Sequence, residues 1–190
     1  IKNDYKIRSI LKNGKIKFLN IYNFKKINFN LNVKGNVLNF KDLNFITNKI
    51  NFFSDNFKIT QNKKDFLFEG EIQNQNAILN DNLLQLLNLN FKYLNFLNTN
   101  FISKNIFSFN IDKKFKIKNL VINSDIQIDK SEYKNFSFLG NYLLEAKDLI
   151  YIQDHKIKIS YKKDNFTAQG SGKVKLSNQF DEIKYSITNT

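Results

Sequence analysis

The sequence predicts an all-β fold, a long antiparallel meander, and three observations lead to this prediction. First, many stretches place an apolar side chain at every second position; in residues 166–176, Phe166, Val174 and Leu176 share one parity and Lys173 and Lys175 take the other. This is the period of a β-strand with one apolar and one polar face. Second, no proline interrupts the 190 residues. Third, the alternating stretches are joined by short polar segments, which leave no room for helical crossovers, so neighbouring strands are expected to pair antiparallel.

The expected strands follow one another with turn signals between them. Gly35-Asn36 predicts a tight turn, residues 54–56 a second turn, and residues 61–65 a polar hairpin loop. After Ile117 the alternation changes phase at Asn119, as a β-bulge would require. The expected strands are residues 5–11, 16–21, 27–33, 37–40, 43–53, 57–60, 66–73, 89–96, 101–111, 115–122, 126–128, 142–152, 157–161, 166–176 and 183–187.

One segment departs from the alternation. Residues 81–87 contain leucine pairs three apart, preceded by Asn80 or Asp81 as a possible helix cap. We therefore expect one short helix near 81–88, whose leucines need a partner surface because the helix is too short to be stable alone.

The composition argues against catalysis. The chain has no cysteine and a single histidine, so it cannot form a disulfide, a thiolate zinc site or a site with several histidine ligands. His155 is expected at a strand end beside Asp154. Glu69 and Glu71 are two apart on a polar strand face, where a solvated pair is expected. The sequence therefore predicts a protein that is not an enzyme and that has no cofactor and no metal site.

The formal charge of +13 first suggests a nucleic-acid partner. However, Arg8 is the only arginine and the lysines are dispersed, so the interpretation is a solvated face with weak attraction to anionic lipid headgroups, and no nucleic acid is expected. No apolar run approaches the roughly 20 residues that span a bilayer. Because the chain opens on Ile1, we expect residues 1–190 to be a single β-rich segment of a longer protein.

The apolar faces of so many strands need a cover, which could be the sheet folded on itself, a second sheet or a ligand. An incompletely curled sheet, a half-barrel, would leave part of this lining uncovered as a hydrophobic groove, in which each buried methylene of an acyl chain contributes about 0.8 kcal/mol. Gly70 and Gly170 suit a bend around a ligand, or equally an ordinary bulge. The alternative is a closed β-sandwich, the structural or adhesin domain of a surface protein. The expected lipid-lining residues are Phe29, Leu31, Phe66, Phe68, Phe107, Phe109, Ile157, Ile159, Phe166, Val174, Ile183 and Tyr185.

Several motifs add a resemblance to a known family. Residues 43–45, 66–74, 81–87 and 107–111, with the closing runs 166–176 and 183–187, resemble the AsmA-like bacterial envelope proteins of the TamB and YhdP type. This resemblance implies a taco-shaped β-sheet with a hydrophobic channel that carries phospholipid acyl chains. It also implies a periplasmic location, anchorage in the inner membrane by a helix outside this segment, possible envelope protein partners and no catalytic residues.

Overall fold

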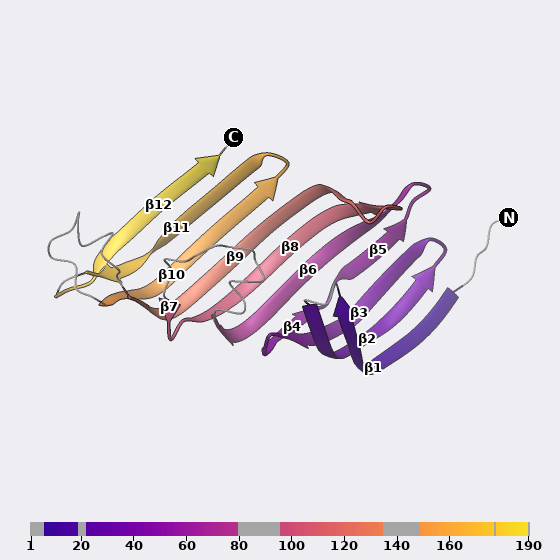
Figure 1. The fold of residues 1–190 in the computed structure, drawn as a ribbon, viewed down its shortest axis with the longest axis horizontal. Coiled ribbons are helices and arrows are strands. Elements are labelled where there is room, and N and C mark those ends of the chain that lie inside the picture. Colours follow the sequence, from indigo (N-terminus) through magenta and orange to yellow (C-terminus); the bar gives the residue numbers. More distant parts are fainter. Residues whose placement is uncertain (1–5, 19–21, 80–95, 135–148, 177, 190) are drawn as a thin grey trace.

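The part of the chain that the structure describes forms one antiparallel sheet of twelve strands (Figure 1). The computed structural model describes residues 6–18, 22–79, 96–134, 149–176 and 178–189, and every element among them is a strand. The strands are β1 (Lys6–Phe18), β2 (Tyr22–Lys34), β3 (Val37–Thr47), β4 (Ile50–Ser54), β5 (Phe57–Gln61), β6 (Asp65–Ile78), β7 (Phe96–Leu97), β8 (Asn100–Asp112), β9 (Ile117–Lys134), β10 (Leu149–Lys162), β11 (Asn165–Lys175) and β12 (Asp181–Asn189). The all-β meander predicted from the sequence is confirmed.

The strands lie in chain order across the sheet, from β1 at one edge to β12 at the other. Two positions are shared by two strands. β4 and β5 both pair with β3 and β6, so they follow each other along a single position of the sheet. β7 and β8 likewise both pair with β9. The described strands therefore do not divide into two facing sheets, as a closed sandwich would require.

Most of the predicted turns are present, but several strand limits differ from the prediction. Residues 43–53, expected as one strand, reverse at Asn48 and Lys49 between β3 and β4. Gly35 has φ 58° and joins β2 to β3, and residues 62–64 join β5 to β6. At residues 54–56, however, the chain does not reverse, because β4 and β5 run in the same direction; the segment interrupts a strand instead. β10 is continuous over 149–162, where the sequence suggested two strands, because a register shift between Gln153 and Lys156 changes the alternation without ending the pairing. The predicted helix near 81–88 lies outside the described residues.

One-residue shifts of this kind recur in the sheet and keep the apolar side chains on one face. Each shift lets two residues of one strand oppose a single residue of its neighbour, which is a β-bulge. At Asn119 the structure confirms the predicted phase change, with φ 53° and a shifted register between Ser108 and Asn110. The strand residues with positive φ at or beside such shifts are Asn13, Lys26, Asp42, Asn76, Asn119 and Asp154.

The protein is thin for its mass. It exposes 14139 Å² of surface, whereas a compact monomer of 22.5 kDa is expected to expose about 9,500 Å². Only six described apolar residues are buried, namely Ile27, Leu43, Ile50, Ala77, Ile150 and Ala168. Since every described element belongs to the same sheet, none of them forms a second layer over it. None of the described residues forms a helix long and apolar enough to cross a bilayer.

Candidate functional site

One face of the sheet carries most of its apolar side chains, and we call it the apolar face. Cross-strand pairing places its members opposite each other, because directly paired residues project to the same side. Phe66 pairs with Ile111 and Phe68 with Phe109. Further along, Ile157 pairs with Ile126 on one side and with Gly170 on the other. The apolar face therefore runs without a change of side across the strand positions from β6 to β12.

Aromatic rings form a connected row on this face. Phe29 and Phe40 have ring centroids 5.1 Å apart, and Phe40 and Phe57 are also separated by 5.1 Å. Phe57 continues to Phe107 at 6.0 Å, and Phe107 to Phe109 at 5.8 Å. Contacts at these distances add to the stability that burial alone supplies. The row links β2, β3, β5 and β8, so it ties together strands that are distant in sequence.

All twelve residues expected to line a groove lie on the apolar face. In β11, Phe166 and Val174 share the parity of Gly170, and in β12 Ile183 and Tyr185 pair with Gly172 and Gly170. Phe66 is 38% exposed, and the other eleven are half-buried. Their placement on one surface is a structural fact, whereas their contact with lipid is taken up below as a proposal.

Sequence reasoning missed several members of the apolar face. Phe40 and Phe57 occupy the middle of the aromatic row, and Ile122 lies between Phe107 on β8 and Tyr161 on β10. The available signal was a spacing of three between apolar residues instead of two, as from Phe40 to Leu43 around Asp42. Such a spacing around an Asn, Asp or Lys is typical of a bulge, after which the apolar side chains return to the same face.

A strip of small polar side chains interrupts the apolar face near the middle of the sheet. Asn74 is fully buried and Ser103 is 6% exposed, and the Ser103 hydroxyl donates a hydrogen bond to Oδ1 of Asn74. Nδ2 of Asn74 donates to the carbonyl of Phe101 at 3.1 Å, and Nδ2 of Asn105 donates to that of Ile72 at 3.2 Å. Because these groups satisfy one another, the strip avoids the cost of buried polar atoms without partners.

His155 lies inside β10 at a bulge, not at a strand end as the sequence suggested. The side chain is 6% exposed and its ring stacks on Tyr185, with centroids 5.6 Å apart and Nε2 3.0 Å from the Tyr185 hydroxyl. Gly170 and Gly172 make room for the two rings, since a Cβ at Gly170 would lie 2.1 Å from Cζ of Tyr185 and one at Gly172 would lie 2.5 Å from Nδ1 of His155. Burial lowers the pKa of His155 and raises the pKa of Tyr185, because desolvation disfavours the charged form of each.

The lowered His155 pKa predicts a stability that depends on pH. The folded state binds its proton less readily than the unfolded state, so stability is complete above the unfolded pKa of about 6.5 and is lost as the pH falls through it toward the folded value. We expect the melting temperature of the wild type to fall between about pH 8 and pH 5, above the range in which carboxylates titrate. The variant His155→Phe keeps a ring on Tyr185 and should have a flatter profile. Circular dichroism gives the melting temperature at each pH. If the melting temperatures of the two proteins depend on pH to the same extent, the prediction is contradicted.

The opposite face is polar and carries the acidic pair noted in the sequence. Glu69 forms an ion pair with Lys58 at 2.8 Å, and Glu71 forms one with Lys104, also at 2.8 Å. Gln73 donates a further hydrogen bond to Glu71. Each carboxylate is thus neutralised by a lysine of a neighbouring strand, where the sequence suggested a solvated pair. Exposed ion pairs of this kind contribute little stability.

The described residues contain no group of three or more His, Asp or Glu side chains placed to hold a metal ion. The chain matches no family model, and comparisons with curated proteins and with solved structures returned no match. A functional conclusion therefore depends on the geometry of the sheet and on the residues of its two faces.

Proposed function

We propose that this chain is a non-catalytic segment of a phospholipid transport protein, and that its apolar face shields acyl chains from water. The observation that carries the proposal is the apolar face itself, which extends across the sheet on both sides of one strip of small polar side chains and over which no described element packs. An apolar surface of this breadth that no described element covers is typical of a binding surface.

The chemistry of the apolar face suits a hydrocarbon ligand. Its most regular part combines phenylalanine and isoleucine, which offer neither charges nor hydrogen-bond donors on their side chains. A bound acyl chain would gain about 0.8 kcal/mol for each methylene removed from water. Ten strand positions with about 4.8 Å between neighbours give a surface about 43 Å wide, enough for more than one chain. We propose that the sheet curls so that this face becomes the floor of a groove.

The resemblance of the sequence to AsmA-like envelope proteins supports the same proposal from a different direction. On that basis we place the segment in the periplasm, as part of a bridge that is anchored in the inner membrane and delivers phospholipid toward the outer membrane. Its partners would be phospholipids and other envelope proteins.

Lipid analysis of the purified protein tests the proposal. After purification without detergent, native mass spectrometry should show a diacyl phospholipid bound to a fraction of the molecules, and thin-layer chromatography of an extract should identify its class. The delipidated protein should take up a fluorescent phospholipid to saturation. A lipid-free protein that also takes up none of the probe would overturn the proposal.

A further inference from the structure

Four turns on one side of the sheet concentrate positive charge, and we call this region the lysine side. It consists of residues 34–37, 61–65, 112–117 and 162–165, which join β2 to β3, β5 to β6, β8 to β9 and β10 to β11 (Figure 1). These residues include eight lysines and three aspartates. All eight lysines are exposed, and none forms an ion pair with another described residue. The lysines are Lys34, Lys63, Lys64, Lys113, Lys114, Lys116, Lys162 and Lys163.

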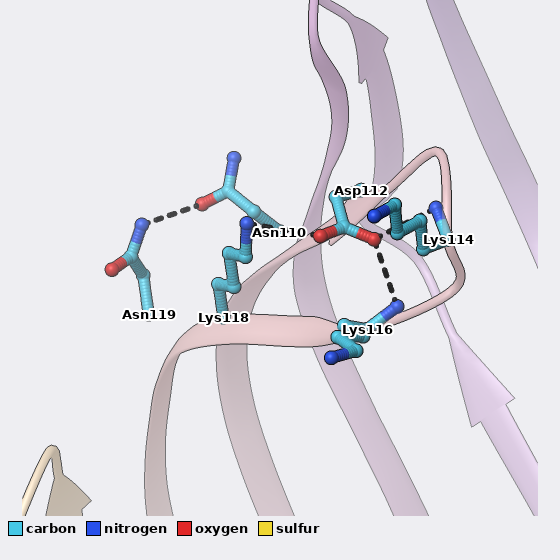
Figure 2. A network of polar contacts seen from close by, with 6 residues as sticks. All are labelled: Asn110, Asp112, Lys114, Lys116, Lys118 and Asn119. Carbon is cyan, nitrogen blue, oxygen red and sulfur yellow. Dashed lines mark hydrogen bonds and ion pairs between the residues drawn. The ribbon is translucent and has the colours of Figure 1, made fainter.

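The turn between β8 and β9 is built around Asp112 (Figure 2). Oδ1 of Asp112 accepts hydrogen bonds from the backbone N–H groups of Lys114 at 2.9 Å and Lys116 at 3.0 Å, and Oδ2 forms an ion pair with Nζ of Lys118 at 2.9 Å. The Lys118 contact and then the Lys116 N–H lower the pKa of Asp112 to about 2, because they favour the carboxylate. The backbone N–H of Phe115 also donates to the carbonyl of Asp112 at 2.9 Å. The turn is therefore a fixed structure.

This fixed turn holds a phenylalanine out into solvent. Phe115 is 86% exposed, and its φ of 59° is left-handed, which is a genuine outlier for a bulky side chain. The other described residues with positive φ are glycine, asparagine, aspartate or lysine. Asparagine or glycine would occupy the position without strain, and an observed outlier of this kind is a reason to look for a function. Lys113, Lys114 and Lys116 surround Phe115 in sequence.

We propose that the lysine side binds the surface of an anionic lipid bilayer, with Phe115 inserted at the level of the headgroups. Aromatic side chains are favoured at the membrane interface, and lysines beside them bind anionic headgroups. The four turns extend over eight strand positions, about 34 Å, which suits an extended charged surface. A nucleic acid is the less favoured partner because the lysine side contains no arginine. This contact goes beyond lipid transport and does not require that the apolar face carries acyl chains.

Charge removal tests the electrostatic part of the proposal. The full chain should cosediment with vesicles of phosphatidylcholine containing about one third phosphatidylglycerol, and not with vesicles of phosphatidylcholine alone. Each lysine near an anionic surface strengthens binding about fivefold, so the triple change Lys113→Gln, Lys114→Gln and Lys116→Gln should weaken it about a hundredfold. The matched control changes Lys130, Lys156 and Lys158 to Gln, which removes the same charge from strands β9 and β10. These lysines lie at least about 13 Å from the turns along the strands, beyond the screening length of about 10 Å, so their loss should have little effect.

Insertion is tested separately at Phe115. Phe115→Gly suits the left-handed backbone, so its melting temperature should equal or exceed that of the wild type while vesicle binding weakens about tenfold. Because the chain has no cysteine, Phe115→Cys accepts a single polarity-sensitive fluorophore. Its emission should shift to the blue when anionic vesicles are added. The same label at Phe180→Cys, which replaces a residue 43% exposed outside the lysine side, should not shift.

Three outcomes would overturn this inference. The first is a control triple variant that loses as much binding as the turn variant, since general charge would then explain the attraction. The second is an unchanged vesicle affinity of Phe115→Gly together with no emission shift at position 115. The third is that the protein does not bind anionic vesicles but binds an RNA or DNA oligonucleotide. Each outcome is independent of whether phospholipid copurifies with the protein.

Discussion

Replacing Phe66 with aspartate is expected to lower the amount of phospholipid bound to the purified protein by about tenfold or more. Phe66 lies on the apolar face, where it pairs with Ile111, and it is 38% exposed. A carboxylate at this position would either lose its hydration against an acyl chain or keep water where the chain should lie, and both are unfavourable. A tenfold loss corresponds to about 1.4 kcal/mol, which is modest for such a contact. Native mass spectrometry gives the bound fraction directly.

The matched control for this variant is Ile106→Asp. Ile106 is 48% exposed and pairs with Asn123 and Glu71, on the polar face of the sheet. The two variants introduce the same charge at apolar positions of similar exposure, so they differ chiefly in the face that receives it. Ile106→Asp should keep the lipid content of the wild type. If both variants lose lipid equally while both remain folded, the apolar face has no special role in binding.

The strand alternation allowed most of the sheet to be predicted from sequence. In β6, β8 and β11 the parity of the apolar residues is regular over long stretches, so both the strand and its apolar face follow from the period of two. This is why all twelve expected lining residues lie on one surface. The alternation is a local property of each strand, and it required no knowledge of how distant strands are arranged.

The bulges and the interrupted strand position were harder to predict, for a physical reason. At Asp154 and Asp42 the local sequence shows a break in alternation, which a turn and a bulge would produce equally. Only pairing with neighbouring strands decides between them, because a bulge keeps the hydrogen-bonded partner and a turn does not. The same holds at residues 54–56, because β4 and β5 both pair antiparallel with β3 and β6 and therefore run in the same direction. His155 was misplaced because its strand was divided at this ambiguous point.

Phe115, which lies outside the apolar face, shows the same limit. Phe115 fits the alternation of a strand that begins at residue 115, and the sequence therefore placed it inside the sheet. In the structure Asp112 accepts hydrogen bonds from the backbone of the following residues and extends the turn to residue 116. The exposure of Phe115 thus depends on one side chain that caps the turn, and apolar patterning carries no signal for such a cap.

Replacing Gly70 with alanine is expected to destabilise the fold by about 2 kcal/mol. Gly70 lies in β6 opposite Phe57, next to the short segment that separates β4 from β5. A Cβ on Gly70 would lie 2.5 Å from the carbonyl oxygen of Asn56 and 3.0 Å from Cα of Phe57, and both are backbone atoms that a side-chain rotation cannot move. Such overpacking costs about 1–3 kcal/mol, more than the fraction of a kcal/mol that alanine gains over glycine in a strand. Urea denaturation should show a lower midpoint with an unchanged slope.

Gly35→Asn is the control for this change, because no atom lies within 4 Å of a Cβ at Gly35 and asparagine tolerates its φ of 58°. Its stability should stay within about 0.5 kcal/mol of the wild type. The backbone N–H of Glu71 donates to the carbonyl of Asn56 at 3.0 Å, so a methyl group at position 70 also threatens the hydrogen bond that holds this segment against β6. If Gly70→Ala were as stable as the control, the segment between β4 and β5 could move away from β6 without a loss of stability. The close approach at Gly70 would then not be what keeps Phe57 in the aromatic row.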